Sequence, residues 1–156
     1  MDRARFEAHE FSFKYGYNIP THVLAQRVAE ITQVYTQEAS SRVLACICTM
    51  IGFDEEKGPQ LFRIDPAGQF FSYHAISTGS RESDATNYFE KLVDELPTYD
   101  SEGVVRSSLK CLQRVLSADV KGTEVEVAFV DEDMTFRLLS PEEIEEHLNA
   151  ITEEDT

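Results

Sequence analysis

Apolar side chains recur at helical spacing near the amino terminus and predict two helices there. The first covers residues 2–15, where Phe6 and Phe13 lie two turns apart, and it ends at a glycine. The second, 21–38, begins at Thr21, whose hydroxyl can cap it. Its predicted buried stripe recurs at every third or fourth residue: Leu24, Val28, Ile31 and Tyr35.

Short apolar runs separated by turn signals follow, and they predict strands. The run VLACICTMI, Val43–Ile51, is rich in β-forming residues and predicts a strand buried on both faces. Residues 60–64 and 69–76 predict two more strands, joined as a hairpin by the turn Asp65–Gly68.

Helical periodicity returns within residues 82–118 and predicts two successive helices. The first stops at Pro97, and the second stops at Gly122 at the latest. Their apolar positions are Ala85, Phe89, Leu92, Val93 and Leu96 in the first, and Val105, Leu109, Leu112 and Leu116 in the second.

The last part of the chain predicts a strand pair and a helix. GTEVEVAFV, 122–130, alternates polar and apolar residues, and MTFRLL, 134–139, can pair with it across the turn 131–133. Ser140-Pro141-Glu142-Glu143 is typical of a capping box that opens a helix. The buried edge predicted for this helix is Ile144, Leu148 and Ile151.

Helices grouped in pairs between groups of strands predict an α+β fold, with helices on both faces of a two-sheet sandwich. The chain has 156 residues, which fits one domain, predicted here over residues 1–152. The acidic end, 153–156, is predicted to be disordered.

The charge balance narrows the possible partners. Twenty-nine acidic and 14 basic residues give a net charge of −15, which disfavours nucleic acid and anionic membranes. No apolar run approaches the roughly 20 residues that a membrane span needs. Three cysteines make an odd number, which fits a reducing compartment. We therefore expect a soluble intracellular protein whose partners are proteins or small molecules.

Two groups of residues could ligate a metal, but neither has the required spacing. Asp54-Glu55-Glu56 places its carboxylates consecutively, whereas an EF-hand loop alternates them around a glycine. Cys46 and Cys48 would share one face of a strand, without a second Cys or His pair at ligand spacing. We predict a solvated turn, buried cysteines, and neither metal nor cofactor.

Residue types that serve in catalysis are present without a catalytic pattern. Four scattered histidines form no HExxH motif: His9, His22, His74 and His147. STGSR, 77–81, contains no GxSxG elbow, and Ser80 or Ser83 can cap the next helix instead. No phosphate-binding GxxxxGK[ST] or GxGxxG occurs. We assign no catalytic residue.

Several ordered motifs together resemble one known family. They are KYGYNIP (Lys14–Pro20), LAQRVAEITQVYTQ (Leu24–Gln37), IGFDEEKGPQLFRIDPAG (Ile51–Gly68), and STG (Ser77–Gly79) followed by NYFEKLV (Asn87–Val93). The chain is similar to an alpha-type subunit of the 20S proteasome over nearly its whole length. QVYTQ and the DEEKGPQL and DPAG segments are most similar to the subunit placed first in the alpha ring.

This resemblance implies an αββα sandwich of the amino-terminal nucleophile hydrolase type. The helices within 2–38 would cover one face and those within 82–118 the other. It also implies a non-catalytic subunit of the alpha ring in the cytoplasm and nucleus, which contacts neighbouring alpha and beta subunits and serves ubiquitin-dependent protein degradation. The helix 2–15 would face the beta ring.

The resemblance covers only the carboxyl-terminal part of such a subunit. In such subunits the gating tail, the first helix, the first strands of the sandwich and the lysine-bearing activator pocket come before the helix that begins here at Asp2, and this sequence does not contain them. Gating and activator docking are therefore assigned to no residue here. Without those strands, the isolated chain is expected to self-associate through open sheet edges.

Two other functions stay open at this point. Catalytic relatives use an amino-terminal threonine, whereas this chain starts Met1-Asp2, and cleavage at Gly122-Thr123 would leave too few residues for a core. We interpret Gly122 as a helix stop and Thr123 as a strand start. The alternatives are an amino-terminal nucleophile hydrolase with unrecognised processing, and a small acidic protein-interaction module.

Overall fold

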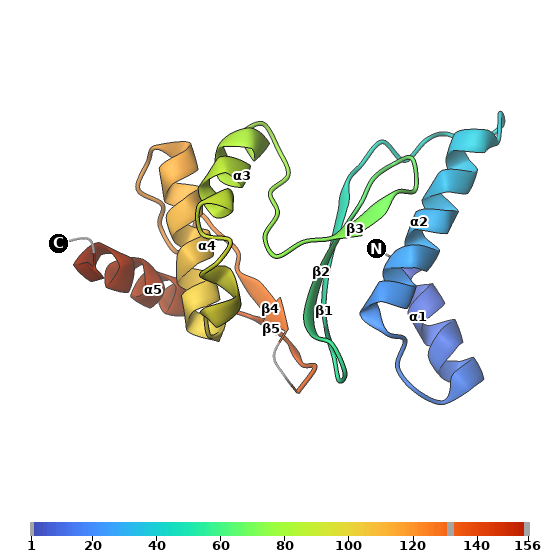
Figure 1. Ribbon diagram of the computed structural model, residues 1–156, viewed down its shortest axis with the longest axis horizontal. Coiled ribbons are helices and arrows are strands. Elements are labelled where there is room, and N and C mark those ends of the chain that lie inside the picture. Colours follow the sequence, from blue (N-terminus) through green and yellow to red (C-terminus); the bar gives the residue numbers. More distant parts are fainter. Residues whose placement is uncertain (1, 131–132, 155–156) are drawn as a thin grey trace. The chain divides into compact units, whose positions relative to one another are not determined.

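The structure is a computed structural model that describes residues 2–130 and 133–154. Five α-helices, one 3-10 helix and five strands occupy these residues, which is the predicted α+β composition (Figure 1). The chain divides into two compact units, residues 1–73 and 74–156. The single domain predicted over residues 1–152 stays a prediction. No helix within the described ranges combines the length and apolarity needed to cross a membrane.

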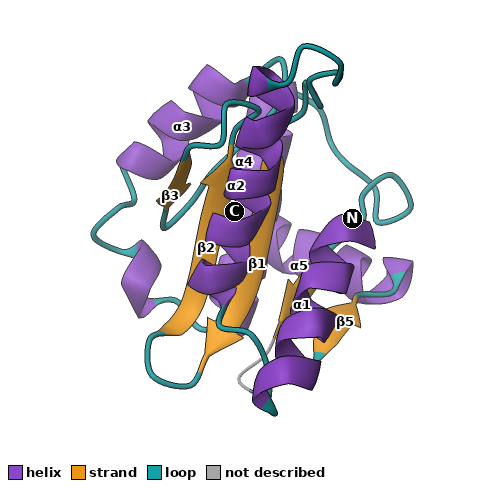
Figure 2. Cartoon of the chain, turned by 90° about the vertical axis from the view of Figure 1, so that its right-hand side faces the viewer, coloured by secondary structure: helices purple, strands orange, loops and turns teal. Residues whose placement is uncertain are grey.

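The first unit consists of two helices and a three-stranded antiparallel sheet. Its elements are α1 (Asp2–Tyr15), α2 (Thr21–Gln37), β1 (Cys48–Asp54), β2 (Gly58–Ile64) and β3 (Phe70–Ser72). The strand order is β1-β2-β3. Helix α2 lies across one face of this sheet, and α1 packs on α2 (Figure 2).

The hairpin predicted at Asp65–Gly68 is confirmed. Ile64 pairs with Phe70 across it, and the Asp65 amide donates to the Gln69 carbonyl at 3.0 Å. The Asp65 side chain accepts from the Gln69 amide at 2.8 Å. Gly68 has φ +85°, which a residue with a Cβ adopts only at a cost.

The strand predicted at Val43–Ile51 is wrong in position and burial. Strand β1 begins at Cys48, continues to Asp54, and leaves Ile51 exposed. Cys48 pairs with Ile64, the last residue of β2, so the preceding residues have no partner within this sheet. Ala45 has φ 49°, which also interrupts an extended strand.

Helix α2 contacts the sheet through small side chains, which corrects its predicted stripe. Ala25 and Ala29 are buried against Phe62 and Ile64. Three residues of the predicted stripe, Leu24, Val28 and Ile31, are only partly buried, and Tyr35 is exposed. The helix approaches the turn so closely that a Cβ on Gly68 would lie 2.6 Å from the Ala29 carbonyl oxygen. Small residues occupy the contact positions because larger side chains there would hold α2 away from the sheet.

The second unit consists of three α-helices, one 3-10 helix and a two-stranded sheet. Its elements are α3 (Glu82–Glu90), the 3-10 helix η1 (Leu96–Thr98), α4 (Ser101–Leu116), β4 (Ala128–Val130), β5 (Phe136–Leu138) and α5 (Pro141–Glu154). The predicted strand pair is confirmed as an antiparallel hairpin, although its turn includes 131–132, which lie outside the described residues. The core joins α4 and α5: Val105, Leu109, Ile144, Leu148 and Ile151.

The capping box predicted before α5 is confirmed in both directions. The Ser140 amide donates to Glu143 Oε2 at 2.8 Å, and the Glu143 amide donates to Ser140 Oγ at 3.2 Å. The bond from the Ser140 amide stabilises the ionised form of the Glu143 carboxylate, and it is the main reason why the pKa of Glu143 lies below its ordinary value of 4.5.

Other predicted caps are corrected. Pro20 rather than Thr21 precedes α2, and Arg81 rather than Ser80 or Ser83 precedes α3, in both cases without a side-chain cap. Backbone carbonyls accept from first-turn amides at these helix starts: the Val23 amide donates to the Pro20 carbonyl at 3.0 Å, and the Glu82 amide donates to the Gly79 carbonyl at 3.3 Å. Asp100 caps α4 instead, because its carboxylate accepts from the Gly103 amide at 2.8 Å.

The ends of α3, α4 and α5 also differ from the prediction. Helix α3 ends at Glu90, before the predicted stop at Pro97, and Pro97 lies in the 3-10 helix η1. Helix α4 stops at Leu116, because Ser117 adopts a left-handed conformation with φ 52°. Helix α5 continues through Glu154, whose carboxylate lies 3.2 Å from the Arg106 guanidinium. The predicted disordered tail 153–156 is therefore helical at 153–154, and residues 155–156 lie outside the described part.

Candidate protein-interaction surface

Helix α1 is held on α2 by a buried carboxylate. Glu7 is 7% exposed, and its two oxygens lie 2.9 Å from Arg3 and 3.3 Å from Arg27 of α2. A buried carboxylate without such partners would be strongly destabilising. The periodicity of apolar residues gave no sign of this contact, because the residues that make it are charged. Glu7 and Arg27 therefore determine which side of α1 faces inward.

Aromatic rings extend this contact at the end of α1. Phe11 is buried, and its ring centroid lies 4.5 Å from that of Tyr15 and 5.2 Å from that of Tyr17. The Arg27 guanidinium lies 5.8 Å from the centre of the Phe11 ring. Arg27 thus joins the ion pair and the aromatic cluster, which orients α1 on α2.

The opposite side of α1 exposes two large apolar residues. Phe6 and Phe13 are 55% and 88% exposed, and their separation by seven residues places them on one side of the helix. We call this pair the α1 outer face. Large apolar side chains on an otherwise charged helix are typical of a protein contact. The predicted helical spacing of Phe6 and Phe13 is present, but it marks the exposed side.

Each sheet also has an apolar face turned away from the helices of its own unit. In the first unit Ile51, Phe71 and Tyr73 are exposed, while alternate residues such as Phe62 are buried under α2. In the second unit Phe136 and Leu138 are about three fifths exposed. We call these the two open sheet faces. Burying them would contribute stability in proportion to the apolar area removed from water.

The acidic turn Asp54-Glu55-Glu56 is explained by its own backbone. Asp54 Oδ1 accepts from the amides of Glu56 and Lys57, each at 3.0 Å. Glu55 and Glu56 are exposed. Within the described ranges no three His, Cys, Asp or Glu side chains lie together as a metal site requires. The Asp54 carboxylate therefore shapes the turn between β1 and β2, and the two glutamates are solvated as predicted.

The cysteines differ from the prediction at one position. Cys111 is buried and Cys48 is half-buried, but Cys46 is exposed because it precedes β1. Burial raises the pKa of the Cys48 thiol above its ordinary value of 9.0, and the nearby Cys46 thiol raises it further. Burial likewise raises the pKa of Cys111, with Arg114 opposing the change. These buried thiols are poor nucleophiles at neutral pH.

The remaining candidates are dispersed. His9 and His74 are exposed, whereas His22 lies in α2 and His147 in α5. STGSR, 77–81, is the segment leading into α3. None of these residues forms an arrangement of nucleophile and base within hydrogen-bonding distance in the described structure.

The bond between Gly122 and Thr123 lies against α5. Gly122 is buried, and its amide donates to Glu145 Oε2 at 2.8 Å. A Cβ on this residue would lie 2.4 Å from the Pro141 carbonyl oxygen. Gly122 is therefore a packing residue and not the predicted helix stop, and Thr123 precedes β4 by several residues instead of starting it.

Comparison with known proteins gives a consistent result. A family model described as "Proteasome subunit" matches residues 1–130. The chain is 43% identical to "Probable proteasome subunit alpha type-1" of Schizosaccharomyces pombe, over 99% of this chain and 64% of that protein. It is 35% identical to "Proteasome subunit alpha type-6" of Caenorhabditis elegans, over 99% of this chain and 63% of that protein.

An archaeal relative agrees with these two. The chain is 30% identical to "Proteasome subunit alpha" of Thermococcus gammatolerans, over 99% of this chain and 58% of that protein. The chain thus spans slightly less than two thirds of the length of these relatives.

Proposed function

This chain belongs to the proteasome subunit family, and from that premise we propose that it is a structural, non-catalytic alpha-ring subunit of the proteasome core particle. One observation carries the proposal: relatives named as alpha-type subunits match 99% of the chain, and the identity reaches 43% with one named alpha type-1. The proposed role is ring assembly and, through it, ubiquitin-dependent protein degradation in the cytoplasm and nucleus.

A non-catalytic role agrees with the local structure of the described residues. An amino-terminal nucleophile could arise inside the chain only by cleavage before a Thr, Ser or Cys. The candidate bond, Gly122–Thr123, lies against α5, where Gly122 is buried and bonded to Glu145. Cleavage there would separate α4 from the strand pair and α5, which complete its core. We therefore do not favour the hydrolase alternative.

We further propose that the two open sheet faces are buried in the αββα sandwich of this fold type. Each unit taken alone has helices on one side of its sheet and exposed apolar residues on the other: Ile51, Phe71 and Tyr73 in the first unit, Phe136 and Leu138 in the second. A sandwich requires this distribution, since both inner faces must be apolar.

The partners that we propose are neighbouring alpha subunits and the beta ring, with the α1 outer face directed to the beta ring. Phe13 is 88% exposed, so nearly all of its aromatic ring is in contact with water in this chain alone. A large apolar side chain exposed in this way often marks a protein contact. An aromatic residue of this kind is typical of an interface anchor.

The proposal is tested by asking whether the chain enters a proteasome particle. The full chain with a carboxyl-terminal tag is expressed in fission yeast, and lysates are separated on native gels with mass spectrometry of the tagged bands. We expect it to comigrate with core particles and to recover alpha and beta subunits. Phe13→Ser should reduce incorporation at least severalfold, whereas Leu116→Ser, also at an exposed apolar residue, should not.

Other outcomes would overturn the proposal. A chain found only as a free monomer would favour the small acidic interaction module. Intact mass showing a processed chain that begins with Thr, Ser or Cys and cleaves peptides would favour the hydrolase. Equal incorporation of Phe13→Ser and Leu116→Ser would show that the α1 outer face does not contribute to assembly.

A further inference from the structure

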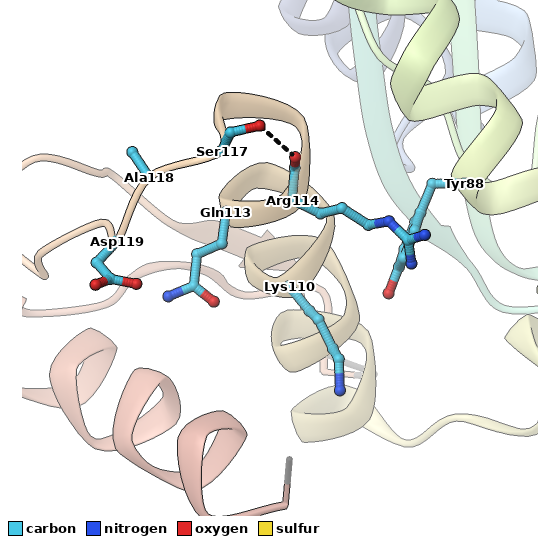
Figure 3. Close-up of a pocket in the computed structure, with 7 residues that line it drawn as sticks. All are labelled: Tyr88, Lys110, Gln113, Arg114, Ser117, Ala118 and Asp119. Carbon is cyan, nitrogen blue, oxygen red and sulfur yellow. Dashed lines mark hydrogen bonds between the residues drawn. The ribbon is translucent and has the colours of Figure 1, made fainter. Parts of the chain in front are cut away.

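Two adjoining depressions on α3 and α4 form a surface whose charge opposes that of the rest of the chain. One, of about 570 Å³, is drawn in Figure 3, and the second, of about 310 Å³, shares Tyr88, Arg114 and Ser117 with it. We call their union the α3–α4 groove. Both depressions lie entirely within the second unit.

The groove concentrates basic residues on a strongly acidic chain. It is lined by four of the 14 basic residues and only two of the 29 acidic ones. These residues are Arg81, Lys91, Lys110 and Arg114, and Asp84 and Asp119. Asp84 is already paired with Arg81 at 3.4 Å. Local positive potential on an acidic protein attracts and orients an anionic partner.

Arg114 is the central cation of this groove. Figure 3 shows its side chain extending towards Tyr88, and the guanidinium lies 5.6 Å from the centre of the Tyr88 ring. Within the described residues this ring contact, and not an ion pair, holds it. A guanidinium stacked in this way keeps its N–H donors available at the edge of its plane.

Tyr88 provides a fixed, partly apolar wall beside this cation. Its ring is half-buried and meets the Phe89 ring at 5.3 Å. Burial raises the pKa of the Tyr88 phenol above its ordinary value of 10.0, so this wall of the groove is uncharged at neutral pH.

The distribution of charge favours a chain of separate carboxylates over one compact phosphate. Lys110 and Arg114 are one turn apart on α4, and Lys91 follows α3, so the cations are spread along the groove. The helix end at Ser117 is the carboxyl-terminal end of α4, whose carbonyl groups and negative dipole oppose a multiply charged phosphate more strongly than a single carboxylate. A multiply charged phosphate prefers converging amide donors at the opposite kind of helix end.

We propose that the α3–α4 groove binds an acidic protein segment, with Arg114 and Lys91 contacting its carboxylates and Tyr88 packing against its backbone. This surface is separate from the α1 outer face, so the proposal goes beyond ring assembly and can fail without affecting it.

Binding is measured by fluorescence anisotropy of a labelled oligoglutamate peptide added to the full chain, with an oligoglutamine peptide of equal length as the neutral control. We expect saturable binding of oligoglutamate only, lost at high salt. Arg114→Glu should weaken it about tenfold, since reversal both removes an attraction and adds a repulsion. Lys57→Glu, the same charge change at the exposed β1–β2 turn, should leave the affinity within about twofold.

Each other outcome overturns the proposal. Absence of saturable binding, equal binding of oligoglutamine, or equal effects of Arg114→Glu and Lys57→Glu would do so. Inorganic phosphate that binds where oligoglutamate does not would show a compact-anion site instead. Circular dichroism checks that each variant is folded. If Arg114→Glu is unfolded, Lys91→Glu replaces it, because Lys91 is exposed and its substitution should cause the same loss of affinity.

Discussion

At the residue scale, the start of α5 shows how few atoms position a helix. Ser140 and Glu143 exchange two hydrogen bonds, and Arg137 of β5 also pairs with Glu143. The same serine and glutamate at cap and third helical position were readable in the sequence, because both halves of a capping box lie within one turn. Arg137 was not, since its contact depends on the strand before the helix.

The ionisation of Glu143 should make stability depend on pH. Its pKa is lower in the folded protein than its ordinary value of 4.5, so its contribution is present above pH 4.5 and lost as pH falls through the folded-state pKa. Glu143→Gln keeps an acceptor for the Ser140 amide and removes the charge. We expect a lower melting temperature than the unmodified chain at pH 7, and a difference that shrinks in acid.

Thermal unfolding followed by circular dichroism at several pH values measures this difference. Glu142→Gln removes the same charge in the same turn, outside the capping box, and should change the pH dependence less. A difference for Glu143→Gln that stayed constant from neutral to acidic pH would show that its ionisation does not contribute.

At the scale of elements, the contact between α2 and the β2–β3 turn is closely constrained. Gly68 combines φ +85° with a Cβ position 2.4 Å from Gln33 Cβ. Gly58, the first residue of β2, has φ +71° and open space around it. Comparison of these two glycines separates backbone strain from steric overlap with α2.

Gly68→Ala should destabilise the chain by about 3 kcal/mol, because left-handed strain and overpacking act together. Gly58→Ala should cost about 1 kcal/mol, from backbone strain alone. Urea unfolding of both variants gives the two values. Equal losses would mean that α2 moves away from the turn without a measurable cost.

At the scale of the whole molecule, the strand edges and the open sheet faces govern behaviour in isolation. Strands β1 and β3 are the edges of their sheet, and apolar side chains such as Phe71 are exposed beside them. Unpaired backbone groups next to apolar surface promote association between chains. We therefore expect the purified chain to self-associate.

Sedimentation velocity measures this association. Phe71→Lys should shift the distribution towards monomer, because it places a charge within the edge strand β3 and so opposes pairing with another chain. Phe13→Lys makes the same change on the α1 outer face and should not. A monomeric chain with one cooperative unfolding transition would contradict the prediction.

Local patterns were enough to predict the order of the α-helices, though not all of their ends, and the Asp65–Gly68 hairpin, the α5 capping box and the family, because each depends on residues close together in the chain. They were also enough to interpret Asp54-Glu55-Glu56 as a turn. Burial was decided by tertiary structure. Ala25 and Ala29, and not the predicted stripe of α2, are the residues buried against the sheet. Phe6 and Phe13 are exposed because the ion pair of Glu7 with Arg27 turns the other side of α1 inward.

The strand at Cys48–Asp54 shows the same division between sequence and tertiary structure. Its β-forming composition is a property of the sequence, but its start is determined by where β2 ends, at Ile64. The α3–α4 groove arose in the same way, from cations on two helices that no spacing rule connects. The sequence of a segment determines which secondary structure it can form. Which of its side chains are buried is decided only by packing against distant residues, because burial depends on both of the segments that are in contact.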